Sequence, residues 1–421
     1  MELSKYVARG DTSVRLILRA FHHRNYRLYF AGQSLSLVGT WIQHTAMSWL
    51  VYRMTGSVLL LGVVGFAGQI PSFLLTPVAG VFVDRLDRRA LLLSTQILAM
   101  LQAFVIAALT LTETVQIWHI MTLSVFLGLV NAFDIPARHS FVVDMVDGRE
   151  DLSNAIALNS SMFHGARLLG PAIAGFLIWT FGEGICFLLN GASYLAIIVS
   201  LIAMRVKSRQ HKATGRTILK DLYEGVDYAF SYPPIRSVLF LIGLISLVGM
   251  PYMVLMPAFA KDILHGGPQT LGFLLASSGV GAFAGTVFLA SRKDANGLGK
   301  VIYFAAFLFA AGLVGFSLSR YLWISLPCLF LAGFGIVVQV ASGNTIVQTI
   351  VEEDKRGRIM SLFNMAFMGM APFGSLLAGA MASRFGVPDT LMLSAILCLA
   401  GSLIFAGRLR HQHEYVFPPE R

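Results

Sequence analysis

The stretch "GVFVDRLDRR" (80–89) is the most informative part of this chain, because it places a knot of charge between two long apolar runs. Five of the six residues from Asp84 to Arg89 are charged, although the chain of 421 residues is 56% hydrophobic and only 13% charged. A soluble domain usually carries about 25% charged residues. The fold of a soluble protein cannot bury this much apolar surface. The sequence therefore predicts a membrane protein whose chain leaves the bilayer at these charged residues.

Twelve apolar runs are long enough to cross a bilayer, whose hydrocarbon core of about 30 Å takes about 20 residues of helix. Backbone polar groups inside hydrocarbon must bond within the protein, so each run is predicted to be a helix. The prediction is therefore an all-α membrane protein with twelve transmembrane helices. The runs are residues 28–51, 58–83, 90–111, 117–138, 155–180, 185–204, 237–259, 270–290, 300–318, 322–344, 359–383 and 388–407.

The distribution of positive charge predicts the orientation of these helices. If the N-terminus is inside, only Arg53, Lys261, Arg320 and Arg384 lie outside and Arg167 lies within a span, so 27 of the 32 Lys and Arg residues fall on one side. An excess of Lys and Arg marks the cytoplasmic side. We expect a protein of the plasma (inner) membrane with both termini in the cytoplasm, and no nucleic-acid partner despite the net charge of +10.

The two halves of the chain repeat one pattern of residues. Ordered matches at nearly one spacing predict two six-helix halves, residues 1–204 and 237–421. Parallel halves of a transporter relate by an axis along the membrane normal and hold the substrate at their interface. The matching pairs, separated by 204 or 205 residues, are Gly128 and Gly333, Val146 and Val351, Asn159 and Asn364, Gly170 and Gly374, and Gly175 and Gly379.

Residues 205–236 between the halves form the most polar long segment. Five of its apolar residues fall on one helical face, which predicts an amphipathic helix at the cytoplasmic interface. Either this helix takes part in transport, or it is only a linker. The five residues are Leu219, Leu222, Tyr223, Val226 and Phe230.

The charged loop resembles a motif of the major facilitator superfamily, in which the loop between the second and third helices reads G-x-x-x-D-R-x-G-R-R. This sequence has Asp87 where the wider family has Gly, and the other positions match. The resemblance implies that Asp84 faces the N-terminus of the eleventh helix, near Arg358. Gly80 is expected to let two helices approach closely.

The resemblance also implies a cytoplasmic gate that holds that side shut while the outside is open. The alternative is a charge anchor that only sets the orientation of the chain. The expected gate residues are Gly80, Asp84, Arg85, Arg88, Arg89, Arg138 and Asp144.

Four further stretches resemble the branch of the superfamily that includes the enterobactin exporter and macrolide efflux proteins. They are "RNYRLYFAGQSLSLVGTWIQ" (24–43), "NAFDIPARHSFVVDMV" (131–146), "ARLLGPAIAG" (166–175) and "RGRIMSLFNMAFMGMAPFG" (356–374). The third contains Gly170, Pro171 and Gly175, which resemble a helix-packing motif of family antiporters, with Ala174 in place of a Gly. The resemblance implies export, and the motif implies exchange of a drug for protons.

Ionisable residues inside a span are costly, so each is a candidate for function. Arg167 falls near the middle of the fifth run, where it can bind an anionic or oxygen-rich substrate, or form a structural pair with Asp134 or a helix-end carbonyl. Asp134 and Arg138 are four residues apart on one helical face. Asp134 can therefore carry protons or form a fixed salt bridge.

The first run contains a polar stripe that is expected to face a cavity or a neighbouring helix, because facing lipid would be costly. His44 in this stripe is a second candidate for proton coupling, since histidine titrates near neutral pH. The alternative is a hydrogen-bonded packing residue. The expected substrate cavity comprises Gln33, Thr40, His44, Asn131, His164, Arg167, Gln339, Asn364 and Met368.

Motifs for other activities are absent from the sequence. It has no G-x-x-x-x-G-K-[ST], no H-E-x-x-H, no G-x-S-x-G and no metal-ligand spacing, so we expect neither an enzyme nor a cofactor or metal. The predicted function is secondary active export of amphipathic small organic molecules of the drug or siderophore class, by alternating access and proton antiport. The expected partners are the substrate, protons and membrane lipids, around a functional monomer. The alternatives are a lysophospholipid or lipid flippase, and a transporter-like sensor that moves no substrate.

Overall fold

A computed structural model describes residues 19–146, 148–205, 218–292, 297–353 and 355–411, and within these residues all regular secondary structure is helical. The first half contains α2 (Arg24–Thr55), α3 (Val58–Arg85), α4 (Arg88–Leu111), α5 (Ile117–Phe141), α6 (Arg149–Phe181) and α7 (Glu183–Ala203), with the short η1 (Arg19–His22) and η2 (Val142–Asp144). The linker helix α8 (Ile218–Ser231) follows. The second half contains α9 (Pro233–Leu244), η3 (Ile245–Gly249), α10 (Tyr252–Ala258), η4 (Phe259–Ile263), α11 (Pro268–Ala290), α12 (Leu298–Leu318), α13 (Leu322–Ile350), α14 (Arg356–Phe385) and α15 (Val387–His411).

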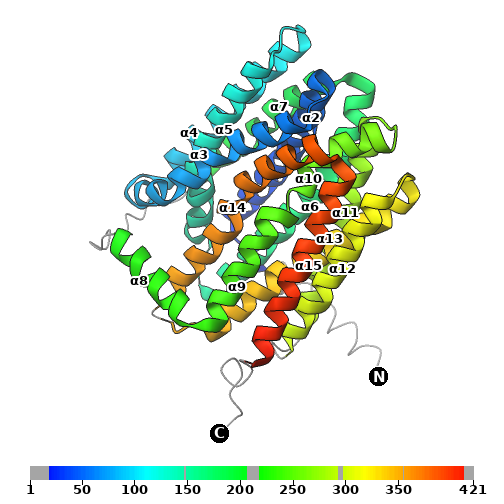
Figure 1. Cartoon of the computed structure of the whole chain (residues 1–421). Coiled ribbons are helices and arrows are strands. Elements are labelled where there is room, and N and C mark those ends of the chain that lie inside the picture. Colours follow the sequence, from blue (N-terminus) through cyan, green and yellow to red (C-terminus); the bar gives the residue numbers. More distant parts are fainter. Residues whose placement is uncertain (1–18, 147, 206–217, 293–296, 354, 412–421) are drawn as a thin grey trace, which may run out of the picture.

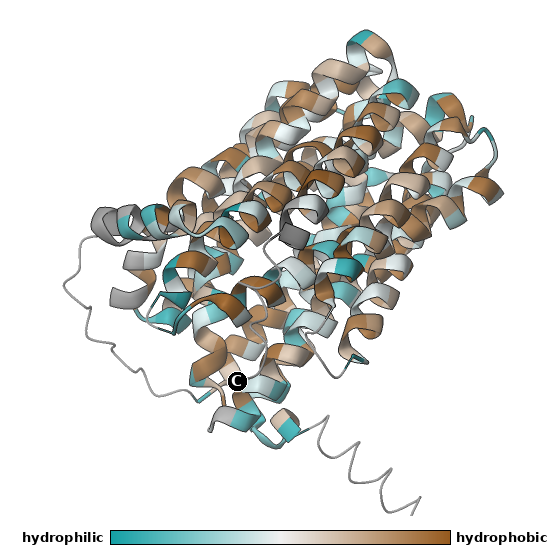
Figure 2. Cartoon of the chain, turned by 60° about the horizontal axis from the view of Figure 1, so that its bottom comes forward, coloured by the Kyte–Doolittle hydropathy of each residue, from teal (hydrophilic) through white to brown (hydrophobic). Residues whose placement is uncertain are grey.

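Each of the predicted apolar runs falls on one of these helices, except the seventh, which is divided into α9, η3, α10 and η4. Eleven segments are long and apolar enough to cross a membrane. The expected twelfth is α2, which is long enough at 32 residues but carries polar residues such as Gln33, Gln43 and His44. Figure 2 shows apolar residues along most of the helix lengths and many hydrophilic residues at the helix ends. The structure confirms an all-α membrane fold.

Helices of each half pack mainly against one another (Figure 1). In the first half α2 packs on α6 and α7, and α3 on α5, whereas in the second half α13 packs on α11 and α12. Two helix pairs, α6 with α11 and α3 with α14, make the main contacts between the halves. The exact boundaries at residues 204 and 237 stay a prediction.

The repeated glycines occupy equivalent positions in the two halves. A Cβ at Gly175 of α6 would lie 3.0 Å from the Cα of Gly272 in α11, and a Cβ at Gly379 of α14 would lie 3.0 Å from the Cα of Gly62 in α3. Because backbones approach this closely only where side chains are minimal, both cross-half contacts depend on glycine. The match of Gly175 with Gly379 in the sequence therefore reflects one structural role used twice.

The bundle has two ends, which we call the linker end, where α8 lies, and the far end, where α2 ends and α3 begins. The Gly175–Gly272 and Gly379–Gly62 contacts lie toward the far end. Toward the linker end, a Cβ at Gly80 or Gly357 would meet no described atom within 4 Å. The described residues therefore show no close helix approach at Gly80 in this conformation, and its role in the gate stays a prediction.

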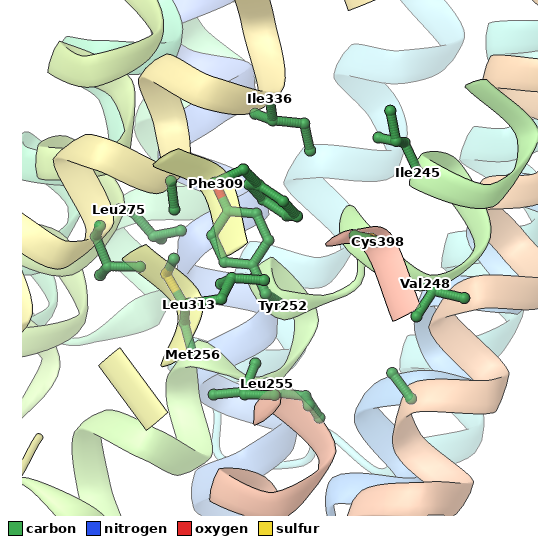
Figure 3. Packing of buried hydrophobic residues seen from close by; sticks show 14 of the residues in the cluster. Ile245, Val248, Tyr252, Leu255, Met256, Leu275, Phe309, Leu313, Ile336 and Cys398 are labelled. Carbon is green, nitrogen blue, oxygen red and sulfur yellow. The ribbon is translucent and has the colours of Figure 1, made fainter. Parts of the chain in front are cut away.

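The broken seventh segment is anchored in a buried apolar core (Figure 3). Two π-helical turns, η3 and η4, flank α10, and Pro251 stands at its start. Tyr252 packs edge-on against Phe309 with ring centroids 6.2 Å apart, and its hydroxyl lies 2.6 Å from Ser278 Oγ. Tyr252, directly after Pro251, thus ties α10 to α11 and α12.

Candidate functional site

Arg167 lies deep in the membrane span at the contact between the halves. It is about 27 Å from the first residue of α6 and about 21 Å from the last, at 1.5 Å per residue. Its Nη2 lies 3.3 Å from the sulfur of Met253 in α10, and its guanidinium carbon lies 5.8 Å from the ring centroid of Trp41 in α2. Arg167 therefore joins side chains from both halves.

Three local features bring these residues together. Gly170 lies where a Cβ would collide with the Cβ of Trp41, so glycine allows α2 to pack against α6 beside Arg167. A Cβ at Gly272 of α11 would lie 2.8 Å from the carbonyl oxygen of Pro171, so glycine also allows α11 to pack against α6. Met253 lies in the first turn of α10, which follows the π-helical turn η3 and Pro251. Interrupted helices of this kind are common at transporter binding sites.

Histidine and aromatic side chains surround Arg167. Trp41 packs edge-on against His44 at 5.7 Å and against Phe163 at 5.9 Å, and Phe163 packs against His164 at 5.8 Å between ring centroids. His44 is exposed, while the Nδ1 atom of His164 is buried and has no hydrogen-bond partner among the described residues. We call Trp41, His44, Phe163, His164, Arg167 and Met253 the Arg167 site.

The pairing of Arg167 with Asp134 that the sequence allowed is not present. Asp134 is 2% exposed and binds its own neighbours: Thr95 and Gln96 of α4 donate to its Oδ1 at 2.8 and 2.7 Å, and Arg138 donates to its Oδ2. Asp134 thus forms a salt bridge with Arg138 in this structure, and its part in proton coupling stays a prediction. Within the described residues no carboxylate pairs with Arg167.

The other predicted cavity residues divide into three groups. Gln339 is fully buried and donates to Ser402 of α15 at 3.2 Å, so its expected place in the cavity is wrong for this structure. Gln33 is also buried, and Thr40 donates to the carbonyl of Ser36 in its own helix. Those that keep accessible surface outside the Arg167 site are Thr40, Asn131, Asn364 and Met368.

A buried polar network in the first half was not anticipated. Gln43 of α2 donates to Gln102 of α4 at 3.0 Å and accepts from Asn190 of α7 at 2.8 Å. Ser193 donates to the Asn190 carbonyl at 2.8 Å. Buried amides need such partners, so the network fixes three helices relative to one another. The sequence sign of this network was the presence of glutamines in otherwise apolar runs.

The charged loop joins several helix ends of the first half. Asp87 caps α4, accepting hydrogen bonds from the backbone N–H groups of Arg89 and Ala90 at 2.8 and 3.1 Å. Arg88 pairs with Asp144 at 3.0 Å. Arg89 donates to the last carbonyls of α7, at Leu201 and Ile202, at 2.8 Å. The side chains of Asp84 and Arg85 lie outside the described residues, so their predicted gate contacts stay predictions.

The linker helix is bound to α14 at the same end. Arg358 pairs with Glu224 of α8 at 2.9 Å, and the Lys355 amine lies 4.3 Å from the ring centroid of Tyr228. Val226 and Phe230 of the predicted apolar face are described, whereas the side chains of Leu219, Leu222 and Tyr223 are outside the described residues. The linker helix α8 thus contacts α14, the helix whose N-terminus the charged loop is expected to face.

Comparisons with known proteins identify the family. A family model described as "Transmembrane secretion effector" matches residues 17–416. The staphyloferrin A transporter of Staphylococcus aureus is 25% identical over 90% of this chain and 95% of its own, and macrolide efflux protein A of Streptococcus pyogenes is 22% identical over 90% and 96%. An inward-facing bacterial homologue of the human lysosomal transporter Spinster has a TM-score of 0.72, 14% identity, and coverage of 94% of this chain and 100% of that structure. The chain belongs to the transmembrane secretion effector family of major facilitator superfamily transporters.

Proposed function

We propose that this transporter exports amphipathic small organic molecules from the cytoplasm across the plasma membrane, as a monomer, by alternating access and exchange for protons. The family and the efflux relatives support export. The linker end is the cytoplasmic end in this proposal, because the excess of Lys and Arg marks that side.

The main observation behind this proposal is that the halves contact each other differently at the two ends of the bundle. Glycine pairs bring α6 to α11 and α3 to α14 at the far end, whereas Gly80 and Gly357 toward the linker end have no described neighbour within 4 Å of a Cβ. Such a conformation is closed outside and receives substrate from the cytoplasm. Export then requires the halves to separate at the far end and approach at the linker end.

For the proton we propose His44 over Asp134. His44 is exposed and packs edge-on against Trp41 in the Arg167 site. Asp134 already accepts hydrogen bonds from Thr95, Gln96 and Arg138. Protonation of His44 would place a second positive charge near Arg167, and the repulsion between these two charges makes the protonation of His44 depend on what Arg167 binds.

The test uses purified protein in liposomes and a panel of dyes, macrolides and catechol siderophores, with and without an imposed pH gradient. We expect gradient-driven movement of at least one compound that a protonophore abolishes. His44→Ala is expected to lose gradient dependence, with Asp134→Asn as the comparison. Movement unaffected by the gradient would contradict antiport, and movement of none of these compounds would contradict export of this substrate class.

A further inference from the structure

We propose that the Arg167 site binds the substrate as an organic anion, with a carboxylate on the guanidinium and an apolar body against Trp41 and Phe163. This inference deepens the proposed export function and rests on it. It specifies the charge and the shape of the substrate, which the proposed function describes only as an amphipathic small organic molecule.

The first argument is the missing counter-charge. Arg53, Arg88 and Arg138 each pair with a carboxylate, respectively Glu183 at 2.7 Å, Asp144 at 3.0 Å, and Asp134. Within the described residues Arg167 has no carboxylate partner, and its guanidinium instead contacts the thioether sulfur of Met253 and the ring of Trp41. An unpaired charge deep in a membrane protein is costly, so a site that keeps one is suited to a ligand that supplies the opposite charge.

The second argument is the pair of imidazole side chains near that charge. His164, on the preceding turn of α6, has a buried Nδ1 without a described partner, and His44 lies across Trp41. A guanidinium holds a carboxylate through two parallel N–H bonds, and an imidazole can donate a third. No carboxylate of the described chain competes for these donors.

The third argument is the apolar wall beside the charge. Trp41 and Phe163 pack edge-on at 5.9 Å, and Met253 supplies an adaptable thioether from the opposite half. Aromatic rings and methionine suit flat or irregular apolar groups. Met253 belongs to the second half and Arg167 to the first. The contacts of a ligand bound to both side chains would therefore change when the halves move relative to each other.

The experiment measures binding to the purified full chain in lipid nanodiscs by isothermal titration calorimetry. The probes are 1-naphthoate and 4-phenylbutyrate, each compared with its neutral amide. The variants are Arg167→Gln, Arg167→Lys and, as a matched loss of one positive charge, Arg384→Gln on the exposed last turn of α14. A thermal unfolding curve of each variant checks that it is folded.

We expect the wild type and Arg384→Gln to bind at least one acid about tenfold or more tightly than its amide, the worth of a charged hydrogen bond. Arg167→Gln should lose this preference, and Arg167→Lys should keep part of it. Equal binding of acid and amide, acid binding unchanged in folded Arg167→Gln, or binding of neither acid would overturn the inference. Transport of neutral or cationic compounds in liposomes would then still support export, so the two proposals fail separately.

Discussion

Asp87 occupies a position that is glycine in the loop motif this sequence resembles, and its carboxylate gives that position a different role. It accepts hydrogen bonds from two backbone N–H groups at the start of α4, which have no partner within the helix. A glycine at this position would only give the backbone freedom to turn. Aspartate gives up that backbone freedom and provides a side-chain cap for α4 instead.

Removing the cap tests this role. Asp87→Ala should lower the free energy of unfolding by about 0.5–2 kcal/mol, because an N-cap is lost, whereas Asp87→Asn should retain most of it. The measurement is thermal or denaturant unfolding of the purified protein in one detergent. Equal destabilisation by alanine and asparagine would show that the charge of Asp87, and not its capping, matters.

Single residues were predictable where their chemistry conflicts with lipid. Arg167 was identified from its depth in an apolar run, and the structure places it beside Met253 of the opposite half. Gln339 was assigned to the cavity on the same grounds, yet it faces Ser402 of α15. Polarity indicates that a side chain avoids lipid, but only the packing of helices tells which neighbour it meets. Trp41 and Met253 were missed because apolar residues give no such signal.

At the scale of elements, the glycines of α6 divide into two kinds. A Cβ at Gly175 would lie 2.8 Å from the carbonyl oxygen of Pro268 in α11, whereas a Cβ at Gly165 would meet no described atom within 4 Å. Both residues lie within the same helix. They therefore form a matched pair for testing the cross-half contact.

Gly175→Ala should slow transport and lower the melting temperature, because backbone at the α6–α11 contact must move apart. Gly165→Ala should leave the melting temperature unchanged or raise it, since alanine in a helix gains about 0.5–1 kcal/mol over glycine. Liposome transport rates and unfolding curves of both variants provide the check. Equal behaviour of the two variants would mean that the far-end contact is not tight in the working protein.

The contact between the linker helix α8 and α14 offers a second test. The Glu224–Arg358 pair is partly exposed, and such pairs contribute about 0.2–1 kcal/mol. Glu224→Gln should therefore change the transport rate by no more than about fivefold, and high salt should produce the same change in the wild type. Asp227→Gln, on the next turn of α8, is the control. A complete loss of transport in Glu224→Gln would give α8 a larger role than this contact explains.

Helix positions followed from the apolar runs, because length and composition alone determine what can cross a bilayer. The break in the seventh segment did not follow. Its run of residues 237–259 is almost entirely apolar, and Pro251 and Pro257 were the main signs of interruption. Whether proline bends, breaks or merely ends a helix depends on neighbours that can bind the freed backbone groups.

At the scale of the whole molecule, the internal repeat explains why two contacts hold the halves together. Gly175 and Gly379 are equivalent in sequence, and each closes one cross-half helix pair. A transporter built from equivalent halves can rotate one half against the other around a central site with little change within each half. The two ends of the bundle must then move in opposite senses.

Paired spin labels test this movement directly. In a protein whose Cys186, Cys328 and Cys398 are replaced by serine, one label pair is placed at Ile156 of α6 and Thr349 of α13, toward the linker end, and another at Glu113 and Tyr321, at the far end. All four label positions are exposed. Electron–electron resonance in nanodiscs reports both distances.

We expect lowering the pH or adding a transported compound to shift the two distance distributions together. The linker-end distance should shorten as the far-end distance lengthens, because the halves behave as two bodies that turn about the Arg167 site. Gly175→Ala should shift the same balance toward a longer far-end distance without any ligand, since its Cβ opposes closure there. Distances that change at one end only would contradict alternating access by rotation and would favour local movement of single helices such as α10.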